Sequence, residues 1–345
     1  MFEVSVSEAV NKLIKIVKSL RGFIIAVAIV LLIIVSLVLY SGAWPPLVVI
    51  ESKSMQHSNT ESFVGTIDTG DMVILKKIAN NTEIRTYLES LADGYQTYGE
   101  YGDVVIYRPY GSETQTPIIH RALLRMEYNT SGGGFDIPVL GEIPSSMWSV
   151  VGGSKDWHNL KAEIVLTGIG YNQVTVRLNV STMLSHFAQT PMVPFSGLVT
   201  MGDNNRGIAD QMSSICWTPV KADWVNGVAR GELPWFGLLK LWITGPAPDG
   251  PVPENSKTGL FVSLGLLIGV PIALDVSSMV LERKGKHPGV WLRSKLGLKQ
   301  KIEAPLEETP SGAKEPQAKK SKDENAKNAP TLGSGSKKKG KKGQR

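Results

Sequence analysis

Two long apolar stretches frame the chain. Residues 22–40 contain no charged side chain, and residues 258–281 form a second apolar stretch that Pro271 and Asp275 interrupt. An α-helix rises about 1.5 Å per residue, so about 19 apolar residues cross a hydrocarbon core of about 30 Å. The pattern therefore predicts two transmembrane helices. The first stretch is longer than the apolar part of a cleaved signal peptide, about 7–15 residues, so we expect it to remain as an anchor.

Between these stretches, apolar residues occur in short runs separated by glycine, asparagine, aspartate and threonine. Irregular spacing of this kind is typical of antiparallel strands and not of alternating strand–helix units. The runs cover residues 47–50, 72–75, 104–107, 163–166, 174–178 and 197–201. One helical pattern, at residues 83–92, interrupts them. The sequence therefore predicts a mostly β domain over residues 41–244, joined to the second apolar stretch by a proline-rich linker at residues 245–257.

Basic residues precede the first apolar stretch and follow the second. They are Lys12, Lys15, Lys18 and Arg21 before the first stretch, and Arg283, Lys284 and Lys286 after the second. Because such residues favour the cytoplasmic side of a membrane, residues 1–21 and 282–345 are expected in the cytoplasm. The β domain then lies outside the cell membrane, in a multi-pass protein for which membrane lipids are expected partners.

The C-terminal segment has a composition of its own. Residues 313–345 hold ten lysines and one arginine against three acidic residues, so this segment carries +8 while the whole chain carries +6. Its near lack of apolar residues predicts a disordered basic tail. The lysines at residues 337–342 suit an anionic membrane surface or ribosomal RNA, and a purely solubilising tail fits equally well. We expect no specific nucleic-acid partner.

Cysteine and metal-ligand patterns are sparse. Cys216 is the single cysteine, so the β domain has no intrachain disulfide and depends on packing. Its neighbour Trp217 and the lack of a nearby histidine motif indicate a buried apolar thiol. No cluster of histidine, cysteine and carboxylate occurs at ligand spacing, so we expect neither a metal nor an organic cofactor.

Three short segments place a serine, a histidine and two carboxylates in order along the β domain. Ser54 follows an apolar run, His120 follows Pro-Ile-Ile, and Asp203 opens the turn Asp-Asn-Asn, with Asp210 seven residues later. A serine hydroxyl becomes a strong nucleophile when a base takes its proton and an acid orients that base. These residues predict a serine hydrolase. The spacing does not decide which carboxylate orients the base.

Each of these residues also fits a structural interpretation. Ser54 suits a surface turn, His120 a buried strand end, and Asp203 a turn in which it bonds its own backbone. His57, three residues after Ser54, is a rival base, although so short a spacing in a turn tends to point the two side chains apart. The prediction therefore depends on the set and its order.

Taken together, the segments resemble signal peptidase I of the archaeal and endoplasmic-reticulum type. The matching segments are residues 51–55, 70–73, 102–108, 118–121, 201–205 and 227–231. The resemblance implies a signal-peptidase-like antiparallel β catalytic domain flanked by transmembrane helices. Residues 128–194 separate the histidine and aspartate segments more widely than compact members require, so we expect an inserted β-rich lobe there.

The resemblance also implies a reaction, the removal of signal peptides from exported preproteins outside the membrane. It makes Ser54 the nucleophile and His120 the general base, where bacterial relatives carry lysine. Asp210 becomes the orienting acid, Asp203 supports the site, and Ser52 adds a hydroxyl to the oxyanion hole. The implied partners are signal-peptide-bearing preproteins, with the protein-translocation channel as a further candidate.

One departure from the family pattern bears on the acid. Asp203 and Asp210 stand seven residues apart, whereas the family pattern has six, so the choice of orienting acid stays open. Two alternatives compete with the signal-peptidase hypothesis. One is a related membrane serine protease for other surface proteins, and the other is a catalytically silent accessory subunit.

Overall fold

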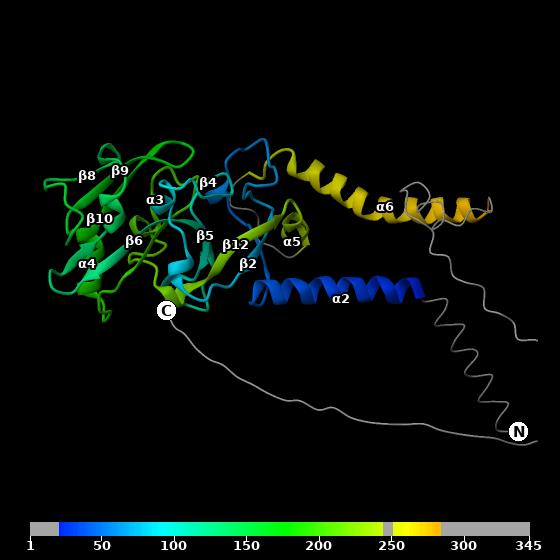
Figure 1. Ribbon diagram of the computed structural model, residues 1–345, viewed down its shortest axis with the longest axis horizontal. Helices are drawn as coiled ribbons and strands as arrows, with labels where there is room; N and C mark the ends of the chain where they lie inside the picture. Colours follow the sequence, from blue (N-terminus) through cyan, green and yellow to red (C-terminus); the bar gives the residue numbers. More distant parts are fainter. Residues whose placement is uncertain (1–20, 244–250, 284–345) are drawn as a thin grey trace, which may run out of the picture. The chain divides into compact units, whose positions relative to one another are not determined.

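The computed structural model describes residues 21–243 and 251–283 of the 345-residue chain (Figure 1). The predicted N-terminal cytoplasmic segment, the start of the linker and almost all of the basic tail lie outside the described residues. Contacts divide the chain into a unit that ends at Val276 and a unit that begins at Ser277. Of the second unit, only the end of helix α6 is described.

Two apolar helices precede and follow the strands along the chain, α2 (Arg21–Ser41) and α6 (Ser256–Arg283). Within the described residues, the segment Ser256–Val280 is long and apolar enough to cross a membrane, whereas the apolar part of α2, Ile25–Ser41, is shorter. Leu32 and Leu267 are typical of their exposed apolar side chains. This surface is compatible with membrane association. The number of crossings and the orientation stay predictions.

The described strands form antiparallel sheets, as the short apolar runs predict. The largest sheet has the order β1-β2-β12-β5-β6-β11, with β7 paired to β6. Its strands are β1 (Leu47–Val49), β2 (Met72–Lys76), β5 (Val104–Tyr107), β6 (Ile118–Asn129), β7 (Gly134–Asp136), β11 (Gly197–Met201) and β12 (Val225–Leu233). The two-stranded pair β3 (Gln96–Thr97) and β4 (Glu100–Tyr101) lies between β2 and β5 in the sequence.

A second sheet comes from residues 128–194. It has the order β10-β9-β8, made of β8 (Trp148–Val150), β9 (Glu163–Ile169) and β10 (Val174–Asn179), and helix α4 (Val180–Gln189) follows β10. Side chains of this sheet share a buried core with β6, in which Leu124 and Met126 pack with Ile164 and Leu178. The second sheet is therefore packed on the large sheet through continuous apolar contacts.

The helix predicted over residues 83–92 is wrong in extent. The structure has a 3₁₀ turn, Asn81–Glu83, and then a short helix, α3 (Tyr87–Ser90). The Thr86 side chain accepts the Glu89 N–H, and the Glu89 side chain accepts the Thr86 N–H. Because this capping box fixes Thr86 outside the helix, α3 begins only after it.

Three carboxyl groups lie near the end of β12, those of Asp68 and Asp71 in buried residues and that of Glu232 in a half-buried one. Asp71 accepts the Trp235 N–H at 2.7 Å and the Asp68 N–H at 2.8 Å, and burial raises the pKa of Asp71 to about 7. Glu232 accepts the Gly65 N–H, and burial raises its pKa to about 7 as well. Asp68 Oδ1 and Glu232 Oε2 are buried without a hydrogen-bond partner within the described residues. The folded protein therefore favours the protonated form of these carboxyl groups.

We predict that Glu232→Gln stabilises the protein above neutral pH. The folded protein keeps a proton on Glu232 up to about pH 7, whereas the unfolded chain releases it near the ordinary pKa of 4.5. The stability that Glu232 contributes is therefore complete below pH 4.5 and is lost as the pH rises through about 7. Glutamine does not titrate, so the advantage of the variant over wild type should grow across this range.

Thermal unfolding of detergent-solubilised protein at pH 5 and pH 8 measures the effect. At pH 8 we expect the midpoint to rise by at least about 2 °C, since 1 kcal/mol corresponds to about 2–4 °C in a domain of this size. Glu142→Gln, at an exposed glutamate, is the matched control. The prediction is contradicted if the midpoint of Glu232→Gln differs from that of wild type by the same amount at pH 5 and at pH 8.

Candidate active site

Ser54 lies in a single 3₁₀ turn, Lys53–Met55, which follows β1. Met55, at the end of the turn, is fully buried and packs in the core with Ile50 and Val73. The first N–H groups of a helical turn have no partner inside the turn. Within the described residues no acceptor bonds the Ser54 N–H. This N–H is a free donor beside the Ser54 hydroxyl, as an oxyanion hole requires.

The two serines of this segment contact each other. Ser52 Oγ and Ser54 Oγ lie 3.1 Å apart in a hydrogen bond, and both side chains are half-buried. Ser52 has an extended backbone at the start of the turn, which brings its hydroxyl beside that of Ser54. The predicted oxyanion-hole residue is therefore next to the predicted nucleophile, and its function stays a prediction.

His120 and Asp210 form a buried pair. His120 Nδ1 lies 2.7 Å and 2.8 Å from the two carboxylate oxygens of Asp210, and both side chains are almost completely inaccessible to solvent. Because a carboxylate only accepts, Nδ1 is the donor in this pair, and in the neutral ring Nε2 is then an acceptor. This is the tautomer that a general base needs.

Two hydroxyl groups fix the Asp210 carboxylate. Tyr107 Oη and Thr200 Oγ1 each donate to Asp210 Oδ2 at 2.7 Å. Tyr107 and His120 lie on the same face of the sheet, since β5 and β6 pair Tyr107 with Ile118. Burial, together with the nearby Asp210, raises the pKa of Tyr107 well above its ordinary value, so the phenol stays a donor. These contacts set the orientation of the acid that bonds His120.

Gly202 brings the serine and the histidine together. A Cβ atom at this position would lie 2.5 Å from the Ser54 carbonyl oxygen and 2.9 Å from His120 Nε2, so only glycine fits there. The next residues fasten the Ser54 turn, because the Asn204 N–H donates to the Ser54 carbonyl at 2.8 Å. The Asn204 side chain also donates to the Lys53 carbonyl at 3.1 Å.

Ser54 and His120 border the same space but are not bonded in this state. Among the described residues, no hydrogen bond joins Ser54 Oγ to His120 Nε2, and the Ser54 hydroxyl bonds Ser52. Catalytic hydrogen bonds are often long in a free enzyme and shorten when substrate binds. Both side chains line the same cavity, and the pairing of Ser54 with His120 stays a prediction.

Asp203 belongs to a different pair. Its carboxylate accepts from Arg121 Nε and Nη2, both at 2.7 Å, and lies 3.0 Å from His57 Nε2. Burial alone raises the pKa of Asp203, but the Arg121 charge and the His57 bond outweigh burial and lower it. His120 bonds Asp210 and not Asp203, so the geometry separates the two carboxylates that the spacing left undecided.

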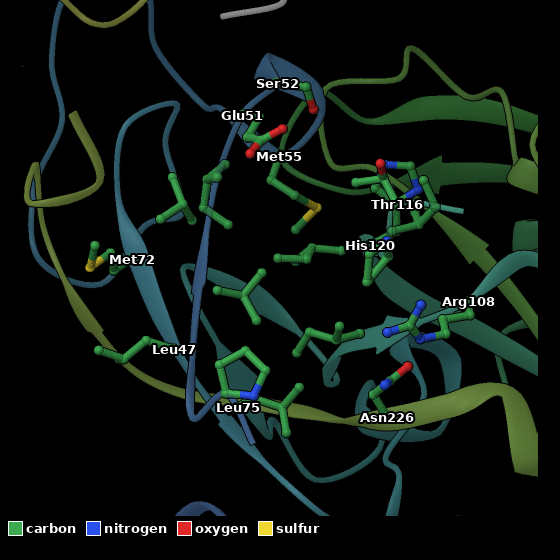
Figure 2. Close-up of a pocket in the computed structure, with 18 of the residues that line it drawn as sticks. Leu47, Glu51, Ser52, Met55, Met72, Leu75, Arg108, Thr116, His120 and Asn226 are labelled. Carbon is green, nitrogen blue, oxygen red and sulfur yellow. The ribbon is translucent and has the colours of Figure 1, made fainter. Parts of the chain in front are cut away.

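A largely apolar groove of about 920 Å³ lies beside Ser52 and His120 (Figure 2). Ser52, Ser54 and His120 line it together with aliphatic side chains, among them Val48, Ile50, Leu75, Ile106 and Ile119. Glu51 and Lys240 also line the groove and form an ion pair of 2.8 Å. His57 and Asp203 are not among the described residues that line it. The rival base therefore lies outside the groove.

Several residues of the site are not evident from the sequence. Tyr107 and Thr200 lie inside apolar runs, where a hydroxyl group is inconspicuous. A buried tyrosine hydroxyl usually has a hydrogen-bond partner, so a tyrosine in a buried apolar run could have indicated a polar contact at Tyr107. Cys216 is buried, as predicted. Within the described residues, no group of three or more His, Cys, Asp or Glu side chains has the arrangement of a metal site.

Comparison of the chain with known protein families gives no match, and comparison with curated proteins gives none either.

Gly202→Ala should impair the reactivity of Ser54. The added methyl group needs the space that the Ser54 carbonyl and His120 Nε2 occupy, so it moves Ser54 away from His120. We expect the rate of labelling by a fluorophosphonate probe, which reacts with activated serines, to fall at least about tenfold, as misplacements of about 1 Å cost this much or more.

The matched control is Gly265→Ala, where nothing lies within 4 Å of the added methyl group. This variant should be labelled at the wild-type rate. Equal labelling of Gly202→Ala and wild type would show that the contact at Gly202 does not govern Ser54.

Proposed function

We propose that this protein is a membrane-anchored serine endopeptidase that removes signal peptides from exported preproteins. The observation that carries the proposal is a groove lined by both Ser54 and His120, with His120 bonded to a buried carboxylate, Asp210. In this proposal the β domain is a signal-peptidase-like fold, and residues 128–194 are its inserted lobe.

The geometry supports a reaction by acyl transfer. His120 Nε2 takes the proton of Ser54 Oγ as Oγ bonds to the carbonyl carbon of the scissile peptide. His120 then gives this proton to the leaving amine as the peptide C–N bond breaks and an ester forms on Ser54. Water attacks the ester, with His120 again as the base, and this step releases the signal peptide and restores the serine.

The oxyanion that forms in each addition step needs fixed donors. The Ser54 N–H is one, and the Ser52 hydroxyl is the second. In the free enzyme the two hydroxyls bond each other at 3.1 Å. When Ser54 rotates toward His120, the Ser52 hydroxyl is released and can donate to the oxyanion.

The groove supports an extended apolar substrate. Among the described strands, β1 pairs with β2 alone, so its other edge can bond an extended peptide. Aliphatic side chains line the walls, as suits the apolar end of a signal peptide. The apolar helices α2 and α6 support an anchor in the bilayer that also holds the preprotein, and this raises the effective concentration of the substrate.

The proposal is tested by cleavage of a labelled preprotein in detergent, with sequencing of the product N-termini. Ser54→Ala should abolish cleavage. Asp210→Asn should lower kcat by as much as about 10⁴-fold, because asparagine no longer holds the tautomer that leaves Nε2 free. Asp203→Asn should mainly lower stability, since it leaves the buried Arg121 guanidinium without a compensating charge.

Asp156→Asn, at an exposed aspartate, is the matched control and should cleave like wild type. A preprotein with bulky residues before the cleavage site separates the proposed signal peptidase from a protease of other specificity, since the former should not cut it. Undiminished cleavage by Ser54→Ala, or an inactive wild type that is folded, would overturn the proposal.

A further inference from the structure

The turn between β9 and β10 reaches the residues that follow Ser54. Tyr171 lies at its tip, in a turn closed by the Gln173 N–H to the Gly170 carbonyl at 2.9 Å. The Tyr171 ring stacks on His57, with 4.2 Å between ring centroids and 25° between planes. Its hydroxyl donates to the Gln56 carbonyl at 3.3 Å. Residues 115 positions apart in the chain therefore meet beside the nucleophile turn.

Tyr171 also contacts Asn204, the residue that bonds the Ser54 turn from the β11 side. Its hydroxyl lies 3.5 Å from Asn204 Oδ1, and the Asn204 N–H donates to the Ser54 carbonyl. One phenol thus contacts the residue that follows Met55 and the residue that fastens the Ser54 carbonyl. A phenol has one hydrogen, so it donates to one of these acceptors at a time.

His57 connects Tyr171 to the buried ion pair. His57 Nε2 lies 3.0 Å from Asp203, whose carboxylate is held by both Nε and Nη2 of Arg121. Arg121 follows His120 on β6. The contacts Tyr171–His57–Asp203–Arg121 therefore run from the second sheet to the strand that carries the base, and neither His57 nor Tyr171 lines the groove among the described residues.

The tip of the turn has a fixed support of its own. The Gly170 N–H donates at 3.0 Å to the hydroxyl of Tyr87, which is buried in α3. Leu166, in β9, and Val176, in β10, are fully buried in the shared core. Tyr171 is therefore presented by strands whose position is set by packing.

We infer that Tyr171 is a positioning residue. Through it, the β9–β10 turn holds the Ser54 turn in a fixed position relative to His120. The inference rests on the proposed function and gives residues 128–194 a part in it. A lone 3₁₀ turn has weak internal hydrogen bonds, so its position depends on outside contacts. The stack on His57 and the bond to the Gln56 carbonyl are such contacts.

The test compares Tyr171→Ala with Tyr171→Phe and with Thr175→Ala, an exposed control on β10. For Tyr171→Ala we expect kcat for preprotein cleavage to fall by about tenfold or more, with KM changed less than about twofold, because the groove itself is untouched. Tyr171→Phe keeps the stack and should recover most of kcat. Thr175→Ala should match wild type.

A second readout does not require activity. Hydrogen exchange of the backbone amides in residues 52–57 should accelerate at least about tenfold in Tyr171→Ala if the turn loosens, and should be unchanged in Thr175→Ala. The effect of His57→Ala combined with Tyr171→Ala should be smaller than the sum of the two single effects, since the stack joins the two residues.

The outcomes separate this inference from the proposed function. Wild-type kcat and exchange in Tyr171→Ala would overturn the inference while leaving an active protease in place. Faster exchange in Tyr171→Ala, with wild type unable to cut any preprotein, would uphold the positioning and overturn the proposed function. A fall in kcat with unchanged exchange at residues 52–57 would also overturn the inference, because the turn would then not have moved.

Discussion

The buried pairing of β6 with the segment after β11 is the constraint on which the site depends. Neighbouring residues of a strand point to opposite faces, so His120 reaches Asp210 on one face while Arg121 reaches Asp203 on the other. Taking Arg121 out of water is costly, and the carboxylate and four backbone carbonyls that it contacts offset this cost. Both carboxylates come from one stretch of eight residues, so fixing one restricts the other.

The position of the Ser54 turn depends on the same stretch. Gly202 allows the chain to pass within van der Waals distance of the Ser54 carbonyl and His120, and Asn204 then bonds the Ser54 turn. A register shift between Val199 and Thr200, where β11 pairs with β6, precedes this passage. Shifts of this kind re-aim side chains, and here Thr200 bonds the Asp210 carboxylate. Ser54, His120 and Asp210 are thus arranged by backbone geometry at one strand end.

The six strands predicted from short apolar runs all occur in the structure, because each run places at least one apolar side chain in a core. The longest strand, β6, was not predicted as a strand of this length. His120, Arg121 and Arg125 break its apolar pattern, and the first two are buried only because acids about 80 to 90 residues away pair with them. Helix α4 was also not predicted, since its serines and threonine weaken the helical pattern. In the structure the Asn179 side chain caps its first turn.

The candidate site divides in the same way. Ser52, Ser54, His120 and the two aspartates follow from short motifs, whereas the choice of Asp210 and the contacts of Tyr107, Thr200 and Tyr171 depend on chain segments that meet only on folding. The core shared by the two sheets has a consequence for cooperativity. Leu124 and Met126 pack against Ile164 and Leu178, so separating the sheets exposes apolar surface on both. The β9–β10 turn is therefore expected to unfold together with the large sheet and not before it.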